Sequence, residues 1–152
     1  MKWANQRVFS AVSLLPDSAL DSYIVNPEWS ARHILQHIVS GADWFVYRLT
    51  GTEWSDIKIP TTMADVAPLA DTLSKRDHMI LGAAELTDEE ITQTIEGKSE
   101  TYFRSTMLMQ AIHHATEHRA QLIDALEYKG FKPINLDGID LWAFENFERA
   151  DR

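Results

Sequence analysis

The sequence predicts an all-α protein built as a four-helix bundle. Four long segments carry apolar residues at helical spacing, the connections between them are modest, and the last segment holds an alternating four-three seam. The chain has 152 residues, and no repeat, low-complexity tract or linker divides it. We therefore expect a single domain over residues 1–152.

The first two helices are bounded by residues that start or stop helices. The first is expected over residues 3–15, because Pro16 follows it at once. The second begins near Trp29, with Ser30 as a candidate N-cap, and Gly51 stops it. Its predicted inward stripe consists of Ile34, Leu35, Ile38, Ala42, Phe45 and Leu49.

The third helix is expected over residues 64–84 and the fourth over residues 105–129, closed by Gly130. On the third helix the predicted inward residues are Val66, Leu69, Leu73, Ile80 and Leu81. Between the two, a turn opens at Thr87, and residues 91–103 contain short alternating pieces around Gly97, which fit either a small hairpin or an irregular loop. The last segment, residues 131–152, is expected to be a tail packed on the bundle through Leu141, Trp142, Phe144 and Phe147.

Charge and composition exclude several classes of function. The net charge is −9 and no basic stripe interrupts it, which argues against nucleic acid as a partner. The chain has no cysteine, so disulfides, thiolate metal ligands and a protein thiol nucleophile are excluded. No apolar run approaches the ~20 residues of a membrane span, and no signal peptide opens the chain. A cytoplasmic location without membrane partners is expected.

Two histidines of the predicted fourth helix indicate a metal site. The seam of this helix is Met107, Ala111, His114, His118, Gln121 and Ala125, with Leu108, Ile112, Ala115, Leu122 and Leu126 beside it. His114 and His118 therefore point inward, and at four residues apart they lie about 6 Å from each other along the helix axis. Two neutral imidazoles at this distance can reach one ion. His113 falls on the polar face and is expected to be solvated.

The second helix offers a third imidazole. By the helical count His37 stands at the border of the apolar arc and His33 lies further out, so His37 is the better inward candidate. Three histidines plus water form a recognised catalytic metal set. The alternative is that these histidines are hydrogen-bonded core residues without an ion. His78 has no histidine partner nearby and is interpreted as a surface residue.

Other metal motifs fit poorly. No Glu-x-x-His occurs in the chain, which excludes a di-iron carboxylate bundle. The run from His114 to His118 matches the letters of the inverted zinc-peptidase motif, with Glu117 as the base. That five-residue pattern is weak, and Glu117 falls on the polar face of the helix.

At these residues the chain resembles the DinB/YfiT-like family of metalloenzymes over nearly its whole length. The segment from Trp3 to Asn5 is similar to the family's usual opening, and residues 29–44 are similar to its second-helix motif. His114 through Gln121 resembles the signature of its last helix, which usually ends His-Arg-Gly-Gln. Here Ala120 replaces the common glycine.

The resemblance implies that His37, His114 and His118 bind one divalent ion, with nickel, zinc or iron expected. It also implies a four-helix bundle in up-down-down-up order and a homodimer. Relatives in this family include thiol-dependent S-transferases and isomerases. The resemblance thus implies an enzyme that transfers a low-molecular-weight thiol to a small electrophile. Metal-assisted hydrolysis and a non-catalytic, metal-binding dimeric bundle remain the alternatives.

Several neighbours of the histidines have candidate roles. Gln121 could hydrogen-bond a ligand or the substrate, and for Arg119 a structural salt bridge is favoured over binding a carboxylate. Trp44 and Trp142 could wall a pocket, although core packing is the simpler interpretation of each. A carboxylate should orient at least one histidine, and the candidates are Asp43, Glu100 and Glu117.

Overall fold

The computed structural model describes residues 1–150, most of which are helical. The five α-helices of this range are α1 (Lys2–Val12), α2 (Ala31–Thr50), α3 (Val66–Ala84), α4 (Arg104–Tyr128) and α5 (Leu141–Ala150). Strands β1 (Glu90–Ile95) and β2 (Lys98–Phe103) pair in a small antiparallel sheet. Short 3₁₀-helices lie in the connections, namely η1 (Asp17–Asp21), η2 (Pro27–Trp29), η3 (Met63–Asp65) and η4 (Leu136–Ile139).

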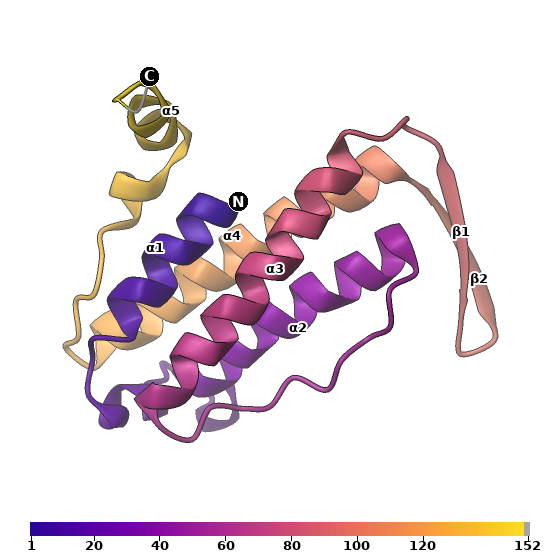
Figure 1. Cartoon of the computed structure of the whole chain (residues 1–152). Coiled ribbons are helices and arrows are strands. Elements are labelled where there is room, and N and C mark those ends of the chain that lie inside the picture. Colours follow the sequence, from indigo (N-terminus) through magenta and orange to yellow (C-terminus); the bar gives the residue numbers. More distant parts are fainter. Residues whose placement is uncertain (151–152) are drawn as a thin grey trace.

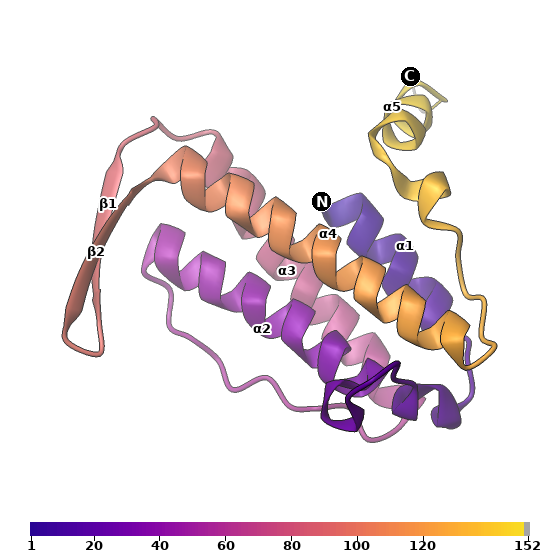
Figure 2. The ribbon, with the colours of Figure 1, turned by 180° about the vertical axis from the view of Figure 1, so that it is seen from behind.

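The first four helices pack lengthwise against one another (Figure 1). α2 and α3 run in the same direction, and α1 and α4 run opposite to both. α2 lies between α3 and α4, and its contact with α4 faces the viewer in Figure 2. The prediction of a mostly helical fold is confirmed. A strict four-helix bundle is not formed, because a hairpin and a fifth helix are added to it.

The core of the bundle is made by the inward stripe predicted for the second helix. All six residues of that stripe are buried, and they meet the buried faces of the other three helices. Helix α2 ends where expected, because Gly51 takes the left-handed conformation at φ 73°. Ser30 occupies the N-cap position of α2, but its hydroxyl hydrogen-bonds Nδ1 of His33 at 2.9 Å instead of capping the helix.

Two residues predicted to face inward are exposed. Leu81 of α3 is 56% exposed and Ile112 of α4 is 52% exposed. The reason is the short α1, whose Asn5 donates to Asp77 Oδ2 at 2.8 Å and so fixes the first turn of α1 level with the middle of α3. Beyond that level α3 and α4 have no helix over them on the α1 side. α1 also ends at Val12, three residues earlier than predicted, and leaves Leu14 exposed.

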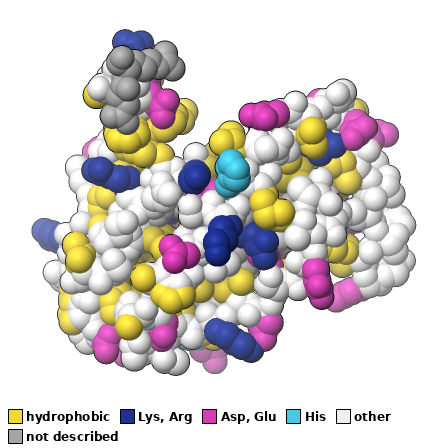
Figure 3. Space-filling model, viewed as in Figure 1, with side chains coloured by type: hydrophobic (Ala, Val, Ile, Leu, Met, Phe, Trp, Pro, Cys, Tyr) yellow, Lys and Arg dark blue, Asp and Glu magenta, His cyan; other side chains and the backbone are white. Residues whose placement is uncertain are grey.

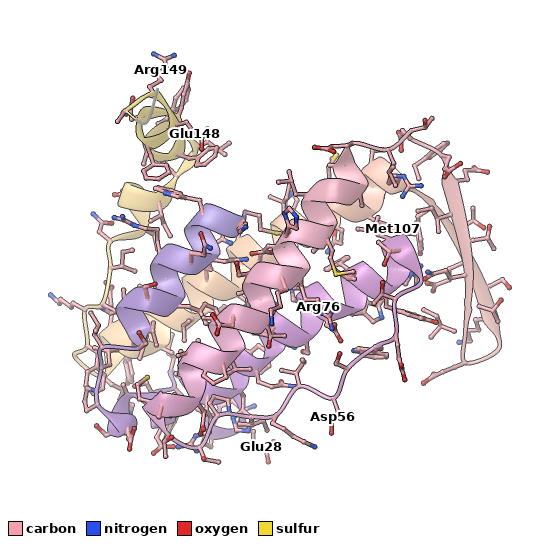
Figure 4. All side chains as sticks on the ribbon, in the orientation of Figure 1. Glu28, Asp56, Arg76, Met107, Glu148 and Arg149 are labelled. Atoms are coloured by element: carbon pink, nitrogen blue, oxygen red, sulfur yellow. The ribbon has the colours of Figure 1, made fainter. Side chains whose placement is uncertain are left out.

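A long connection returns the chain from the end of α2 to the start of α3. Because the two helices run in parallel, residues 51–65 must travel back along the bundle. Asp43, a buried carboxylate of α2, accepts from the backbone N–H of Ser55 and pairs with Arg76 of α3. Figure 4 labels Arg76 on α3 and Asp56 on the connection beneath it. Asp43 therefore holds this connection against two helices.

Residues 91–103, for which the sequence left two alternatives, belong to a β-hairpin. Ile95 pairs with Lys98, so Glu96 and Gly97 form a two-residue turn. Both have positive φ, 50° and 78°, as a type I′ turn requires. The hairpin is attached to the end of α2 by Gln93, whose side chain donates to the carbonyls of Tyr47 and Arg48.

The predicted packing of the C-terminal tail is only partly right. Ile139 is buried in the core and Phe131, Ile134 and Leu136 lie against it. Residues 151–152 of the predicted tail lie outside the described residues. The helix α5 stands away from the bundle, with no buried residue and with Trp142 76% exposed (Figure 1). Trp142 also neither walls a pocket nor packs in the core. Phe144 and Phe147 do reach the body of the protein, with ring centroids 5.6 and 5.7 Å from Trp3. Within residues 1–150, no helix has both the length and the apolar character to cross a membrane.

Candidate metal centre

The three histidines singled out in the sequence converge between α2 and α4. One ring nitrogen from each of His37, His114 and His118 lies within 4.8 Å of the others. Nε2 of His114 is 3.1 Å from Nε2 of His37. The ring centroids of His37 and His114 both lie 4.4 Å from that of His118. The antiparallel packing of α2 on α4 thus brings together imidazoles separated by up to 81 positions in the sequence.

A glycine makes room for one of these rings. A Cβ atom placed on Gly41 of α2 would lie 2.2 Å from Cε1 of His114 and 2.9 Å from each ring nitrogen. Carbon atoms do not approach so closely without displacement. Only glycine therefore allows the His114 ring to lie against the backbone of α2, one turn beyond His37.

His118 is oriented from behind by an amide. Its Nδ1 lies 2.9 Å from Oε1 of Gln121, which also accepts from the indole N–H of Trp29 at 3.0 Å. Since that oxygen is an acceptor, Nδ1 of His118 carries the proton and Nε2 is free to bind an ion. Nε2 of Gln121 in turn donates to Glu117 at 3.2 Å, which fixes the amide orientation. Gln121 fills the orienting position for which a carboxylate was expected.

Aromatic rings exclude water from parts of the site. Trp29 meets His37 and His118 edge-on, at centroid distances of 5.0 and 5.7 Å, and Phe45 meets His114 at 5.7 Å. Burial, with smaller contributions from the neighbouring His118 and His37, lowers the pKa of His114 to about 4. Burial also lowers the pKa of His37. Both rings are consequently neutral at pH 7, which is the form that binds metal ions.

The lowered pKa of His114 predicts a pH-dependent stability for the metal-free protein. Between its unfolded value of 6.5 and its folded value of about 4, the unfolded chain binds a proton that the folded chain does not. Stability should therefore fall as the pH drops below 6.5, and this contribution should be fully lost near pH 4. The measurement is the urea midpoint against pH in the presence of a chelator.

The matched variant for this prediction is His114→Gln, which cannot titrate. Its urea midpoint should fall less steeply than that of the parent protein between pH 6.5 and 5. Identical slopes for the two proteins would contradict the assignment of this pH dependence to His114.

The donor set fits a single divalent ion. Two nitrogens bound at about 2.0–2.1 Å to a tetrahedral zinc lie roughly 3.3 Å apart. The 3.1 Å separation of the His37 and His114 nitrogens is close to this value. The third nitrogen, on His118, lies within 4.8 Å of both, which is near enough for all three residues to hold one ion. Three neutral imidazoles leave coordination positions for water or a substrate.

The other candidate residues lie elsewhere. Asp43 holds the connection after α2, and Glu100 of β2 pairs with Arg48 at 3.2 Å, so neither contacts a ligand histidine. Glu117 is exposed and reaches the site only through Gln121. Trp44 packs on Phe45 and on the Arg48 guanidinium, as its interpretation as a core residue predicted. His78 and His113 are exposed, as predicted.

Arg119, in the last-helix motif, contacts the opening segment of the chain through Asn5. Its guanidinium donates to the side-chain oxygen of Asn5 at 2.6 Å and to Thr116 at 2.9 Å, and Asn5 in turn donates to Asp77. The predicted structural role is right, but the direct partner is an amide and not a carboxylate. The sequence did not reveal the supporting roles of Asn5, Trp29 and Gly41. Asn5 lies in the opening segment and Trp29 in the second-helix motif that resemble the family, but neither motif indicated these contacts.

Comparisons with known proteins agree with the observed fold. A crystal structure of a DinB-like protein from Bacillus cereus superposes with a TM-score of 0.63 at 23% identity, covering 88% of this chain and 90% of that one, which shows a shared fold. No curated protein sequence matches the chain. The sequence model of the DinB family matches residues 1–148. The chain therefore belongs to the DinB family.

Proposed function

We propose that this protein is a metal-dependent enzyme whose divalent ion is held by His37, His114 and His118. The observation that carries the proposal is the convergence of these three imidazoles from two facing helices. The neutral state of His37 and His114, the fixed tautomer of His118 and the space left by Gly41 support it. Nickel, zinc and iron all suit imidazole ligands.

The chain's own residues prepare the site for this ion. Gln121 keeps the proton of His118 on Nδ1, and Trp29 holds Gln121 in place through its indole N–H. Trp29 and Phe45 shield the rings from water, which strengthens electrostatic interactions inside the site. A divalent ion bound here would act as a Lewis acid and stabilise an anionic oxygen or sulfur at neutral pH.

The reaction we favour is transfer of a low-molecular-weight thiol to a small electrophile. Sulfur forms a bond to the electrophilic carbon, the bond between that carbon and its leaving group breaks with the electron pair going to the leaving group, and the proton of the thiol passes to solvent. The chain contains no cysteine, so the thiol must be a separate molecule. This reaction is the one implied by the family resemblance, and three histidines leave positions at which such a thiol can bind.

The test is a panel assay on metal-loaded protein. The protein is loaded with zinc, nickel or iron and mixed with one thiol at a time and a fluorogenic bimane as the electrophile. The control is the variant in which His37, His114 and His118 are all alanine. A rate above that of the control with at least one thiol is expected. No such rate with any thiol refutes thiol transfer, and cleavage of a nitrophenyl ester without a thiol would identify a hydrolase instead.

The hydrogen bond from His118 to Gln121 predicts the effect of a single change. Replacing Gln121 by leucine removes the acceptor for the Nδ1 proton and leaves the Trp29 N–H without its partner. Metal affinity should fall by about 10–100-fold, which is typical for the loss of an orienting partner. Competition against a chromophoric chelator measures this change.

Gln110→Leu is the matched control, because Gln110 lies on the same helix and is exposed. Its metal affinity should equal that of the parent protein. If both leucine variants bind metal equally well, Gln121 does not orient His118.

The homodimer implied by the family resemblance stays a prediction.

A further inference from the structure

A large cavity lies away from the histidines. It has a volume of about 490 Å³ and is bounded by the start of α1, the second half of α3, the first half of α4 and the inner side of α5. We call it the α5 groove, and its main apolar walls are Trp3, Ile80, Leu81, Ile112, Phe144 and Phe147. Figure 3 shows hydrophobic side chains on both sides of the notch between the α5 lobe and the body of the protein.

The groove has the dimensions and lining of a small-molecule site. Pockets for small ligands usually measure about 300–1,000 Å³ and combine apolar walls with a few polar groups. The polar side chains here are Lys2 and Gln6 on α1, Asp77 on α3 and Glu148 on α5. Glu148 lies on the far wall, where Figure 4 labels it. None of the three candidate metal ligands lines the groove.

Asp77 is the group that distinguishes this groove from a simple apolar gap. Its side chain is 2% exposed, yet it forms part of the groove lining. Oδ2 accepts from Asn5, whereas Oδ1 has no hydrogen-bond partner among the described residues. Arg119 reaches Asn5 and forms no ion pair with Asp77. A buried carboxylate oxygen without a donor is costly, and such groups usually have a partner.

We propose that the α5 groove binds an amphipathic amine, with the apolar body against Trp3, Leu81 and Phe147 and the amine donating to Oδ1 of Asp77. A protonated amine supplies the missing donor, and its charge matches a carboxylate better than a neutral hydroxyl does. Burial raises the pKa of Asp77, although the Asn5 hydrogen bond and the positive charges of the Met1 amine, Arg119 and Lys2 act in the opposite direction. A cation in contact with the carboxylate stabilises its charged form further. The proposal is independent of the metal centre.

The test uses three probes with the same eight-carbon chain: octylamine, 1-octanol and octanoate. Each is titrated into the ¹⁵N-labelled full-length protein and followed by ¹H–¹⁵N correlation spectra. Octylamine should shift the amides of Leu81 and Ile112 and the indole signal of Trp3 in a saturable way. It should bind about tenfold more tightly than 1-octanol, the difference expected for one charge-assisted hydrogen bond, and octanoate should bind most weakly.

Two variants test the two halves of the site. Asp77→Asn should abolish the preference for the amine over the alcohol. Leu81→Gln should weaken octylamine about tenfold through the lost apolar contact. Leu86→Gln is its control, because Leu86 is 57% exposed at the same end of the protein and does not line the groove. The Leu81 comparison remains decisive if Asp77→Asn does not fold.

Several results would overturn the proposal. Among them are the absence of saturable shifts with octylamine, equal affinity for the three probes, equal weakening by the Leu81 and Leu86 changes, and groove signals that move with protein concentration alone. The last result would show that a second copy of the chain covers the groove. Unchanged octylamine binding by the triple histidine variant is expected, and loss of binding there would assign the amine to the metal centre instead.

Discussion

Replacing His118 by alanine should abolish binding of a divalent ion, from about one ion per chain to none. His118 is the most buried of the three histidines, and its Nε2 is the nitrogen left free by the bond to Gln121. Removing a ligand should cost more affinity than the about 10–100-fold lost when an orienting partner is removed. Elemental analysis of the purified protein measures the metal content directly, and calorimetry gives the affinity.

The same variant should lose the stabilisation that metal gives to the folded state. At a metal concentration of ~1,000 times Kd, binding adds about 4 kcal/mol to the free energy of unfolding. For a chain of this size that corresponds to a rise in Tm of about 8–16 °C. The parent protein should show this rise and His118→Ala should not.

His113→Ala is the matched control for this experiment. His113 precedes His114 on the same helix but is exposed. It should keep both the metal and the rise in Tm. Metal retained by His118→Ala at the parental affinity would show that the three imidazoles do not form the site.

Helical periodicity predicted which histidines lie together because it depends on local geometry. A spacing of four on one helix fixes the relative position of His114 and His118 whatever the tertiary structure. The choice of His37 over His33 used only the direction of the apolar arc of the second helix, and the structure brings His37 to the other two rings. His33, one turn earlier, instead contacts Ser30.

The errors arose where burial depends on the length of a neighbouring helix. Leu81 and Ile112 have the spacing of core residues, but α1 starts level with Asp77 and does not cover them. No pattern within α3 or α4 contains that information. The hairpin was left undecided because β2 exposes side chains on both faces and the turn begins with Glu96 instead of the usual Asn, Asp or Gly.

The orienting partner of His118 illustrates a different limit. Three carboxylates had suitable chemistry, but the sequence cannot show which side chains face the back of a ring. Asp43 and Glu100 are used by the connection after α2 and by the hairpin. Gln121 occupies the position because it is three residues from His118 on the same helix. The sequence did contain an indication of this role, because Gln121 is the last residue of the last-helix signature motif.

Gly41→Ala should disrupt the metal centre without removing any ligand. The new Cβ would lie 2.2 Å from Cε1 of His114, so the ring must rotate or α2 must move away from α4. Cε1 is bonded to Nε2, and any displacement of the ring therefore separates Nε2 from its neighbour on His37. We expect metal affinity to fall by at least about 100-fold, the upper end of the effect of losing an orienting partner. Chelator competition measures the change.

Gly82→Ala separates this steric effect from the general effect of alanine in a helix. Gly82 lies within α3, and a Cβ there would meet no atom within 4 Å. That variant should bind metal as the parent does and gain about 0.5–1 kcal/mol in stability, because alanine favours the helix over glycine. Gly41→Ala should show no such gain, since the clash offsets it. If Gly41→Ala binds metal with the parental affinity, the His114 ring can move away from α2 without loss of metal binding. The close approach of α2 to that ring would then not be required for the site.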